Sequence, residues 1–356
     1  KLKLTRIKIY KSKSTSNKIA YFPQRLFRIT WADTAPGMSW MSMLKYTDVE
    51  IENIDDSEMY DMVAHHGIRG GVSMIGHRYA RSNNPYIPED YNPEEPNSYI
   101  MYWDANSLYG LAMSMSLPIG DYKFVHNIDI EKMKKRSMEV NAKPEGRGWI
   151  LEVDLDIPTE LHDYFDDYAP AVESLNISDN MLSHYQLSEK KELEIGSSKI
   201  NKLVPTLNNK KKYVCHYRNL VYYLELGCVL KKIHRVIEFT EKPWLKTYID
   251  KCTEMRKGAT NDFDKDFYKL LINSVFGKTM ENIEGRVDLK LVSDEKTLFR
   301  LVNKELFKDS KMFNEDLVGI KMLRKKVVAN KPIIVGSAIL ELSKLHMLRF
   351  HYDYIK

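Results

Sequence analysis

An apolar run that ends on a carboxylate constrains this chain more than any other feature. Residues 99–103 are all apolar or aromatic, and a run of this length and composition predicts a strand. The residues that follow read Asp104-Ala105-Asn106-Ser107-Leu108-Tyr109. The pattern predicts a strand that turns into a helix just after Asp104. An aspartate in that place can present its carboxylate to a cation.

The chemistry of this string suits a magnesium-dependent nucleotide site. Mg²⁺ takes few protein carboxylates and leaves its other positions to water and substrate phosphates, so Asp104 is a candidate catalytic metal ligand and the Ala105 carbonyl a further one. The backbone N–H groups of Ser107 and Leu108, at the start of the helix, are candidates for a triphosphate. Tyr109 could lie under the sugar and exclude a 2′-hydroxyl. The alternative is that Asp104 caps a helix and Tyr109 is a core aromatic.

A second string predicts a helix with one polar face. It reads Lys269-Leu270-Leu271-Ile272-Asn273-Ser274-Val275-Phe276-Gly277. Lys265, Lys269, Asn273 and Phe276 recur at the three- and four-residue spacing that places side chains on one face of a helix. A lysine there can meet a triphosphate as a point charge, and Phe276 can form a flat floor for a base. Gly277 would let a nucleic acid approach the backbone closely. The alternative is an amphipathic helix with solvated lysines and a buried Phe276.

Composition sets modest limits on the class of protein. The 356 residues carry 54 basic and 49 acidic side chains, and the net charge of +5 does not by itself indicate a nucleic-acid-binding protein. Three cysteines without metal-type spacing favour a reducing, intracellular compartment, with nucleus and cytoplasm both left open. No apolar run approaches the ~20 residues of a membrane span, so we expect no membrane partner. The first residue is not methionine, and we expect the chain to be part of a longer protein.

The spacing of apolar residues and the positions of proline and glycine predict the remaining elements. We expect an extended loop over residues 82–97, where four prolines occur, and an irregular exposed segment over residues 127–147. The expected helices cover residues 38–46, 244–257, 262–281 and 332–356, and the expected strands cover residues 148–155, 229–239 and 286–292. The run Lys210-Lys211-Lys212 predicts a solvated face.

The two strings, in this order, resemble motifs A and B of family B DNA polymerases, which read roughly D-x-x-S-L-Y and K-x-x-x-N-S-x-Y-G. More narrowly, the chain resembles the protein-primed polymerases of viruses and of self-synthesising (Polinton/Maverick-type) DNA transposons. Further strings carry that likeness, namely Gly67-Ile68-Arg69-Gly70-Gly71-Val72-Ser73, His216-Tyr217-Arg218-Asn219-Leu220, Gly277-Lys278-Thr279-Met280-Glu281-Asn282 and Asn330-Lys331-Pro332-Ile333.

The resemblance implies a role for each matched residue. Asp104 would be a catalytic ligand of Mg²⁺, and Tyr109 would be the gate that tests the sugar. Lys269 and Asn273 match the lysine and asparagine of motif B, with Phe276 where many relatives have tyrosine. The nucleotide-binding set would be Ser107, Leu108, Tyr109, Lys257, Lys265, Lys269, Asn273 and Phe276. The set in contact with DNA would be Arg69, Gly70, Gly71 and Gly277, although an ordinary glycine turn also explains residues 69–71.

The same resemblance implies an α+β right-hand architecture with a partial palm, helical fingers and insertions. The expected division is an exonuclease-like tail and linker over residues 1–60, a first palm part over 61–120, an insertion over 121–245, fingers over 246–282, a second insertion over 283–331 and a truncated palm helix over 332–356. The implied partners are a DNA template and primer, dNTP and a terminal priming protein.

Two departures from the family pattern matter. The carboxylate-rich motif C, usually Tyr-x-Asp-Thr-Asp, does not occur before Lys356, and no early D-x-E string stands in the place of an exonuclease site. We therefore expect a template-directed DNA polymerase that adds dNTP to a primer hydroxyl with two Mg²⁺ ions, but little or no synthesis by this chain alone. The alternatives are a non-catalytic DNA-binding remnant of a transposon or viral gene and an unrelated nucleotide-binding α+β protein.

Overall fold

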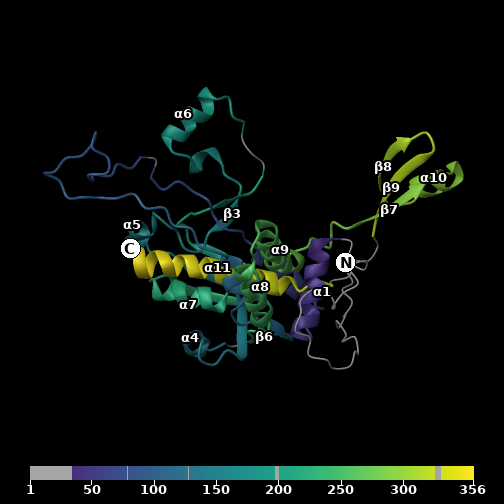
Figure 1. Cartoon of the computed structure of the whole chain (residues 1–356), viewed down its shortest axis with the longest axis horizontal. Helices are drawn as coiled ribbons and strands as arrows, with labels where there is room; N and C mark the ends of the chain where they lie inside the picture. Colours follow the sequence, from purple (N-terminus) through teal and green to yellow (C-terminus); the bar gives the residue numbers. More distant parts are fainter. Residues whose placement is uncertain (1–33, 78, 127, 197–199, 325–329) are drawn as a thin grey trace.

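A four-stranded antiparallel sheet forms the centre of the molecule, which is a computed structural model that describes residues 34–77, 79–126, 128–196, 200–324 and 330–356 (Figure 1). Its strands lie in the order β1-β6-β2-β5. They span Leu117–Phe124 (β1), Gly146–Asp156 (β2), Lys210–His216 (β5) and Val229–Lys242 (β6). The apolar, β-branched composition of β2 and β6 explains their length, because such side chains pack well on a pleated surface. The strands expected over residues 148–155 and 229–239 are therefore confirmed.

Helices pack around this sheet in one continuous apolar core. Helix α11 (Ile333–Phe350) is buried over most of its surface and contacts β1, β5 and five helical segments (yellow in Figure 1). The other long helices are α1 (Ala35–Thr47), α7 (Tyr217–Glu225), α8 (Lys246–Gly258) and α9 (Asp262–Thr279). Helix α9 packs on α1 and α8. These helices confirm the expectations for residues 38–46, 244–257, 262–281 and 332–356, since apolar residues recur in each with the helical period.

Shorter elements connect these parts. They are α2 (Ser57–Asp61), the π-helical turn η2 (Met62–Gly67), α3 (Leu108–Met113), α4 (Ile130–Glu139), η3 (Thr159–Leu161), α5 (His162–Phe165), β3 (Glu173–Leu175), η4 (Asp179–Met181), α6 (His184–Glu192), β4 (Lys202–Val204) and the C-terminal turn η5 (His351–Ile355). The strands β3 and β4 pair with each other. None of the helices in the described ranges is long and apolar enough to cross a membrane.

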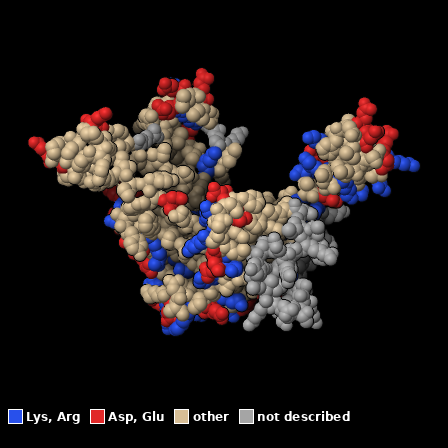
Figure 2. All heavy atoms as spheres, in the orientation of Figure 1, with Lys and Arg blue, Asp and Glu red and all other residues tan. Residues whose placement is uncertain are grey.

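A small module with its own core projects from the body (Figures 1 and 2), and Figure 2 shows that its surface carries both basic and acidic side chains. It contains β7 (Val287–Val292), α10 (Glu295–Val302), β8 (Phe307–Asn314) and β9 (Leu317–Leu323), and its sheet has the order β7-β9-β8. Val292, Leu301, Ile320 and Met322 form a hydrophobic cluster separate from that of the body. The strand expected over residues 286–292 is confirmed as β7.

Two predictions of local structure are wrong. Residues 99–103 form no strand, and their side chains are exposed, up to 90% for Tyr102. A strand needs a neighbour for its backbone hydrogen bonds, and no described strand lies beside this run. Residues 127–147 contain the helix α4, which Asp129 caps by accepting a hydrogen bond from the Glu131 N–H. The expected loop over residues 82–97 is confirmed, because residues 79–106 contain only turns and extended chain.

The expected segments can be compared with the observed elements at β1 and at the projecting module. The boundary between residues 120 and 121 falls inside β1, whose pairing with β6 joins the expected first palm part and the expected insertion in one sheet. The expected segment 283–331 contains the whole projecting module. Residues 1–33 of the expected exonuclease-like tail lie outside the described residues.

Candidate nucleotide and nucleic-acid site

The chain turns sharply at Ser107 and enters α3 at Leu108, as expected from the first string. Ser107 has a left-handed backbone conformation with φ of 53°. Gly110 makes this turn possible, since a Cβ atom at residue 110 would lie 2.5 Å from the Ser107 Oγ. The first N–H groups of a helix have no acceptor within it, so those of Leu108 and Tyr109 remain suited to an anion.

The second string lies on α9 and presents the expected polar face. Asn261 caps the helix by accepting a hydrogen bond from the Asp264 N–H at 2.9 Å. The side chains of Lys265, Lys269 and Asn273 are exposed, as is Gly277. The Lys265 ammonium lies 3.1 Å from Asp262, whereas Lys269 has no partner in the described part of the chain.

The two strings meet through their aromatic side chains. The rings of Tyr109 and Phe276 are stacked, with 4.4 Å between centroids and 23° between planes. A Cβ atom at Gly110 would lie 3.6 Å from Ile272, so α3 packs directly against α9 at this point. The structure thus brings together residues 167 positions apart, and the exposed Lys269 and Asn273 lie on the same helix as the ring pair. Stacking at this distance is a favourable aromatic contact, and both rings are partly buried against the main apolar core.

Asp104 lies just before this turn with an exposed carboxylate. The neighbouring ring of Trp103 contacts Phe350 of α11, with 5.6 Å between centroids. Within the described ranges, no group of three or more histidine, cysteine, aspartate or glutamate side chains could hold a metal ion. Asp104 and the Ala105 carbonyl alone therefore do not fit a site for two Mg²⁺ ions, which needs carboxylates beyond those brought together here.

Lys257, the remaining candidate for the triphosphate, ends helix α8 and is exposed. It has no partner among the residues that the structure places. Since α8 packs on α9, Lys257 adds a second unpaired cation on the pair of helices that carries Lys269. A phosphate chain would find these charges free, because neither must first leave a carboxylate.

The side chain of Arg69 is held by backbone carbonyls and a ring of the protein. Its guanidinium donates hydrogen bonds to the carbonyls of Val214 at 2.8 Å and His66 at 3.0 Å, and it lies 3.9 Å over the Tyr213 ring. Gly70 and Gly71 follow in an exposed segment without regular structure, and a Cβ atom at either would meet open space. Arg69 thus anchors this segment, and the two glycines are the part of the string that a nucleic acid can approach.

We expect Arg69→Met to destabilise the fold by about 2 kcal/mol, because hydrogen bonds from a charged donor contribute more than neutral ones. The measurement is urea unfolding followed by circular dichroism. Arg81→Met is the matched control, since Arg81 forms an exposed ion pair with Asp90 and its loss should change stability by less than ~1 kcal/mol. Equal midpoints for Arg69→Met and the wild type would contradict this anchoring role.

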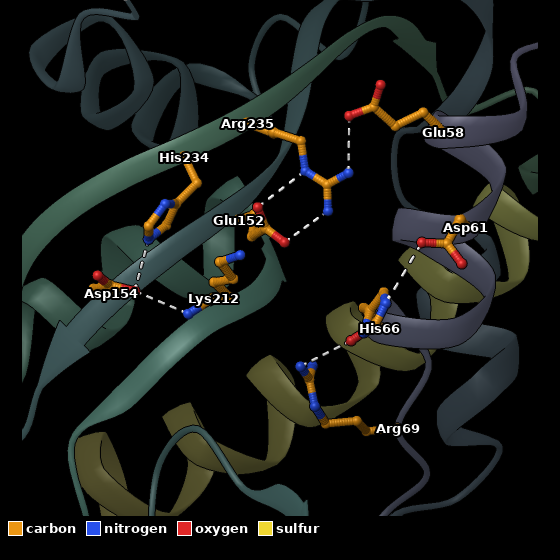
Figure 3. Close-up of polar contacts among 9 residues, drawn as sticks. All are labelled: Glu58, Asp61, His66, Arg69, Glu152, Asp154, Lys212, His234 and Arg235. Atoms are coloured by element: carbon orange, nitrogen blue, oxygen red, sulfur yellow. Dashed lines mark hydrogen bonds and ion pairs between the residues drawn. The ribbon is translucent and has the colours of Figure 1, made fainter.

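A network of ion pairs, which the sequence reasoning missed, holds the segment before Arg69 on the sheet (Figure 3). Arg235 of β6 binds Glu152 of β2 with two hydrogen bonds of 2.7 and 2.9 Å, and it reaches Glu58 of α2 at 3.1 Å. Burial alone would raise the pKa of Glu152, but the hydrogen bonds from Arg235 lower it below its usual value. Glu152 and Asp154 lie two residues apart in an otherwise apolar strand, and this pattern in the sequence could have indicated a polar network on one face of the sheet.

Asp154 extends this network to the next strand. It accepts a hydrogen bond from the Lys212 N–H at 2.9 Å and lies 2.8 Å from the His234 ring nitrogen (Figure 3). The Lys212 N–H, followed by His234, lowers the pKa of Asp154. These contacts join β5, β2 and β6 at one end of the sheet and so stiffen the platform that carries α2, η2 and the segment at Gly70.

The string over residues 216–220 is a core element. His216 is buried, which lowers its pKa to about 3, and it caps α7 by accepting a hydrogen bond from the Arg218 N–H. Asn219 is also buried and donates to the Glu341 carbonyl of α11 at 2.9 Å. This string therefore joins β5, α7 and α11, and its resemblance to the family reflects packing.

Comparison with known proteins identifies the family of the chain. The sequence model of a family described as DNA polymerase type B, organellar and viral, matches residues 87–356. The match includes both strings and leaves residues 69–71 outside it. The chain belongs to this family of DNA polymerases. Its predicted resemblance to family B DNA polymerases and its α+β class are thereby confirmed.

Solved structures of phi29 DNA polymerase resemble the chain. The complex with primer-template DNA is 15% identical with a TM-score of 0.48, over 90% of this chain and 45% of that one. The ternary complex with incoming nucleotide substrates is 15% identical with a TM-score of 0.47, over 87% of this chain and 44% of that one. The chain thus spans less than half the length of these polymerases. No curated protein matches it in sequence.

Proposed function

We propose that this chain forms the nucleotide-binding and template-binding part of a DNA-directed DNA polymerase, with α3 on the palm and α8 and α9 as the fingers. The observation that carries the proposal is the stacking of Tyr109 on Phe276, which places the two strings in one site. Family membership supplies the class of reaction, the transfer of a dNTP to a primer hydroxyl. Protein priming, which the sequence resemblance implies, belongs to the same proposal.

Each residue of the site has a role in this proposal. The unpaired ammonium of Lys269 binds the triphosphate, and the N–H groups at the start of α3 add hydrogen bonds to its oxygens. The Tyr109 ring lies under the sugar and excludes a 2′-hydroxyl by contact. The Phe276 ring supports the base that pairs with the template, and Gly277 leaves room for the duplex.

We also propose that the chain alone binds DNA and dNTP but extends a primer little or not at all. Asp104 is the carboxylate at the proposed site. The described residues around it supply too few further ligands to hold two Mg²⁺ ions. Mg²⁺ remains the cofactor implied for the whole protein, where it would activate the primer hydroxyl and stabilise the leaving pyrophosphate.

The test combines DNA binding with primer extension. We expect fluorescence anisotropy to detect binding of a labelled primer–template, and the next correct dNTP to strengthen that binding. We expect no extension product with Mg²⁺ and all four dNTPs. Absence of DNA binding at low salt would refute the proposed function. Mg²⁺-dependent extension that Asp104→Asn abolishes would refute only the proposed inactivity of the isolated chain.

A further inference from the structure

Three cations from separate segments converge on one carboxylate at the base of the projecting module. The carboxylate of Glu281, just after α9, accepts a hydrogen bond from the Lys278 ammonium at 3.3 Å and two from the Arg286 guanidinium at 2.6 and 3.1 Å. Lys331, just before α11, approaches the same carboxylate at 3.9 Å. Arg286 also donates to the Asn330 side chain at 3.1 Å. We call Lys278, Glu281, Arg286 and Lys331 the Glu281 cluster.

The Glu281 cluster carries more positive than negative charge. Its three cations face one carboxylate, and the nearby Glu284 instead pairs with His65 at 3.4 Å. The cationic side chains are only 14–25% exposed, so water solvates the excess charge incompletely. Burial lowers the pKa of Lys331, and the neighbouring Lys278 and Arg286 lower it further despite the attraction of Glu281. An added anion would relieve this repulsion.

The fold holds these cations in place. A Cβ atom at Gly336 would lie 2.6 Å from the Thr279 Oγ1, so the end of α9 and the start of α11 approach each other closely. Lys331 also lies 5.1 Å over the ring of Trp40 on α1. A cation held by packing loses little entropy on binding a ligand. The cluster is therefore better prepared for an anion than a set of mobile surface lysines.

We propose that the Glu281 cluster is a binding site for a backbone phosphate of nucleic acid. A guanidinium and two ammonium groups are the donors that phosphate oxygens prefer. Lys278 directly follows the exposed Gly277 in the last turn of α9, shortly before the chain leaves the body for the module. The choice of nucleic acid as the ligand rests on the proposed function. A phosphate there would compete with Glu281 for the three cations.

The test measures how DNA affinity depends on salt concentration. Each phosphate contact contributes about one unit to the slope of log affinity against log salt, so Lys331→Gln should lower that slope by about one. Glu281→Gln removes the competing carboxylate and should raise DNA affinity. Unfolding cannot explain that gain. The control is Lys296→Gln, an exposed lysine on α10 that lies outside the cluster and should leave the slope unchanged.

A second measurement uses inorganic phosphate alone. A ligand that binds the folded state raises its melting temperature. At constant ionic strength, phosphate should stabilise the wild type more than Lys331→Gln, and Lys296→Gln should behave as the wild type. An unchanged salt slope in Lys331→Gln, together with an unchanged phosphate effect, would overturn the inference and leave the cluster as a structural ion-pair network. If the wild type bound no DNA, the proposed function would fail, and the phosphate measurement would still decide whether the cluster binds phosphate.

Discussion

Replacing Lys269 by alanine is expected to weaken binding of the incoming dNTP by roughly ten- to hundredfold, the equivalent of the 1.5–3 kcal/mol that a charged hydrogen bond contributes. The reason is that Lys269 is an exposed cation with no competing carboxylate in the described ranges, on the helix whose Phe276 stacks on Tyr109. Affinity for the primer–template should change little, because the triphosphate is the ligand of this side chain.

The measurement titrates the next correct dNTP into a complex of the chain with a labelled primer–template. Lys265→Ala is the matched control, one helical turn away on the same face of α9. The charge of Lys265 is already paired with Asp262, so Lys265 should contribute little to binding of the triphosphate. We expect Lys265→Ala to weaken dNTP binding less than threefold, about the ~0.5 kcal/mol that an exposed ion pair contributes. Equal effects of the two substitutions would contradict the assignment of Lys269 to the triphosphate.

The second large effect concerns stability. Lys210 begins β5 with a side chain that is 0% exposed, so the expected solvated face is wrong for this residue, whereas Lys211 and Lys212 are exposed as expected. Its ammonium donates to Glu173 at 2.7 Å and to the Thr206 carbonyl and hydroxyl at 2.9 and 2.8 Å. Burial lowers the pKa of Lys210. Removing one partner of such a pair leaves a charge uncompensated, so Glu173→Ala should destabilise the fold by about 3 kcal/mol.

A second substitution separates the charge effect from a simple loss of contacts. If Lys210 is replaced by methionine in the Glu173→Ala background, the uncompensated charge disappears and much of the lost stability should return. Urea unfolding of the two single variants and the double variant gives the coupling free energy. A double variant less stable than Glu173→Ala would show that the ammonium is not the source of the effect.

The sequence predicted the elements whose pattern is local. The helical spacing in α9 and α11 and the β-branched runs of β2 and β6 identify these elements without tertiary information. Strand β1 was missed because Pro118 and Gly120 interrupt its apolar pattern, and the structure has register shifts at these residues. The strand predicted over residues 99–103 was wrong because strand formation depends on a partner that composition cannot reveal.

The sequence predicted which residues belong to the candidate site better than it predicted how they are arranged. Spacing placed Lys269, Asn273 and Phe276 on one face, but only the fold brings Tyr109 onto Phe276. Arg69 has the sequence context of a nucleic-acid contact, yet two backbone carbonyls and a ring occupy its guanidinium. A run of three lysines likewise does not show which of them points inward, and here the positive φ of Lys212 and the register shift in the β2–β5 pairing interrupt the usual alternation of strand faces.

The two ends of the projecting module are neighbours, because Arg286 at its entry donates a hydrogen bond to Asn330 at its exit. With a hydrophobic cluster of its own and adjoining ends, the module has the properties of a domain grafted into a surface loop of a host. Relatives can then differ in length at this point at little energetic cost, since closing a longer loop adds less than ~1 kcal/mol for each doubling. Residues 287–323 can thus change in length without a rearrangement of the main core.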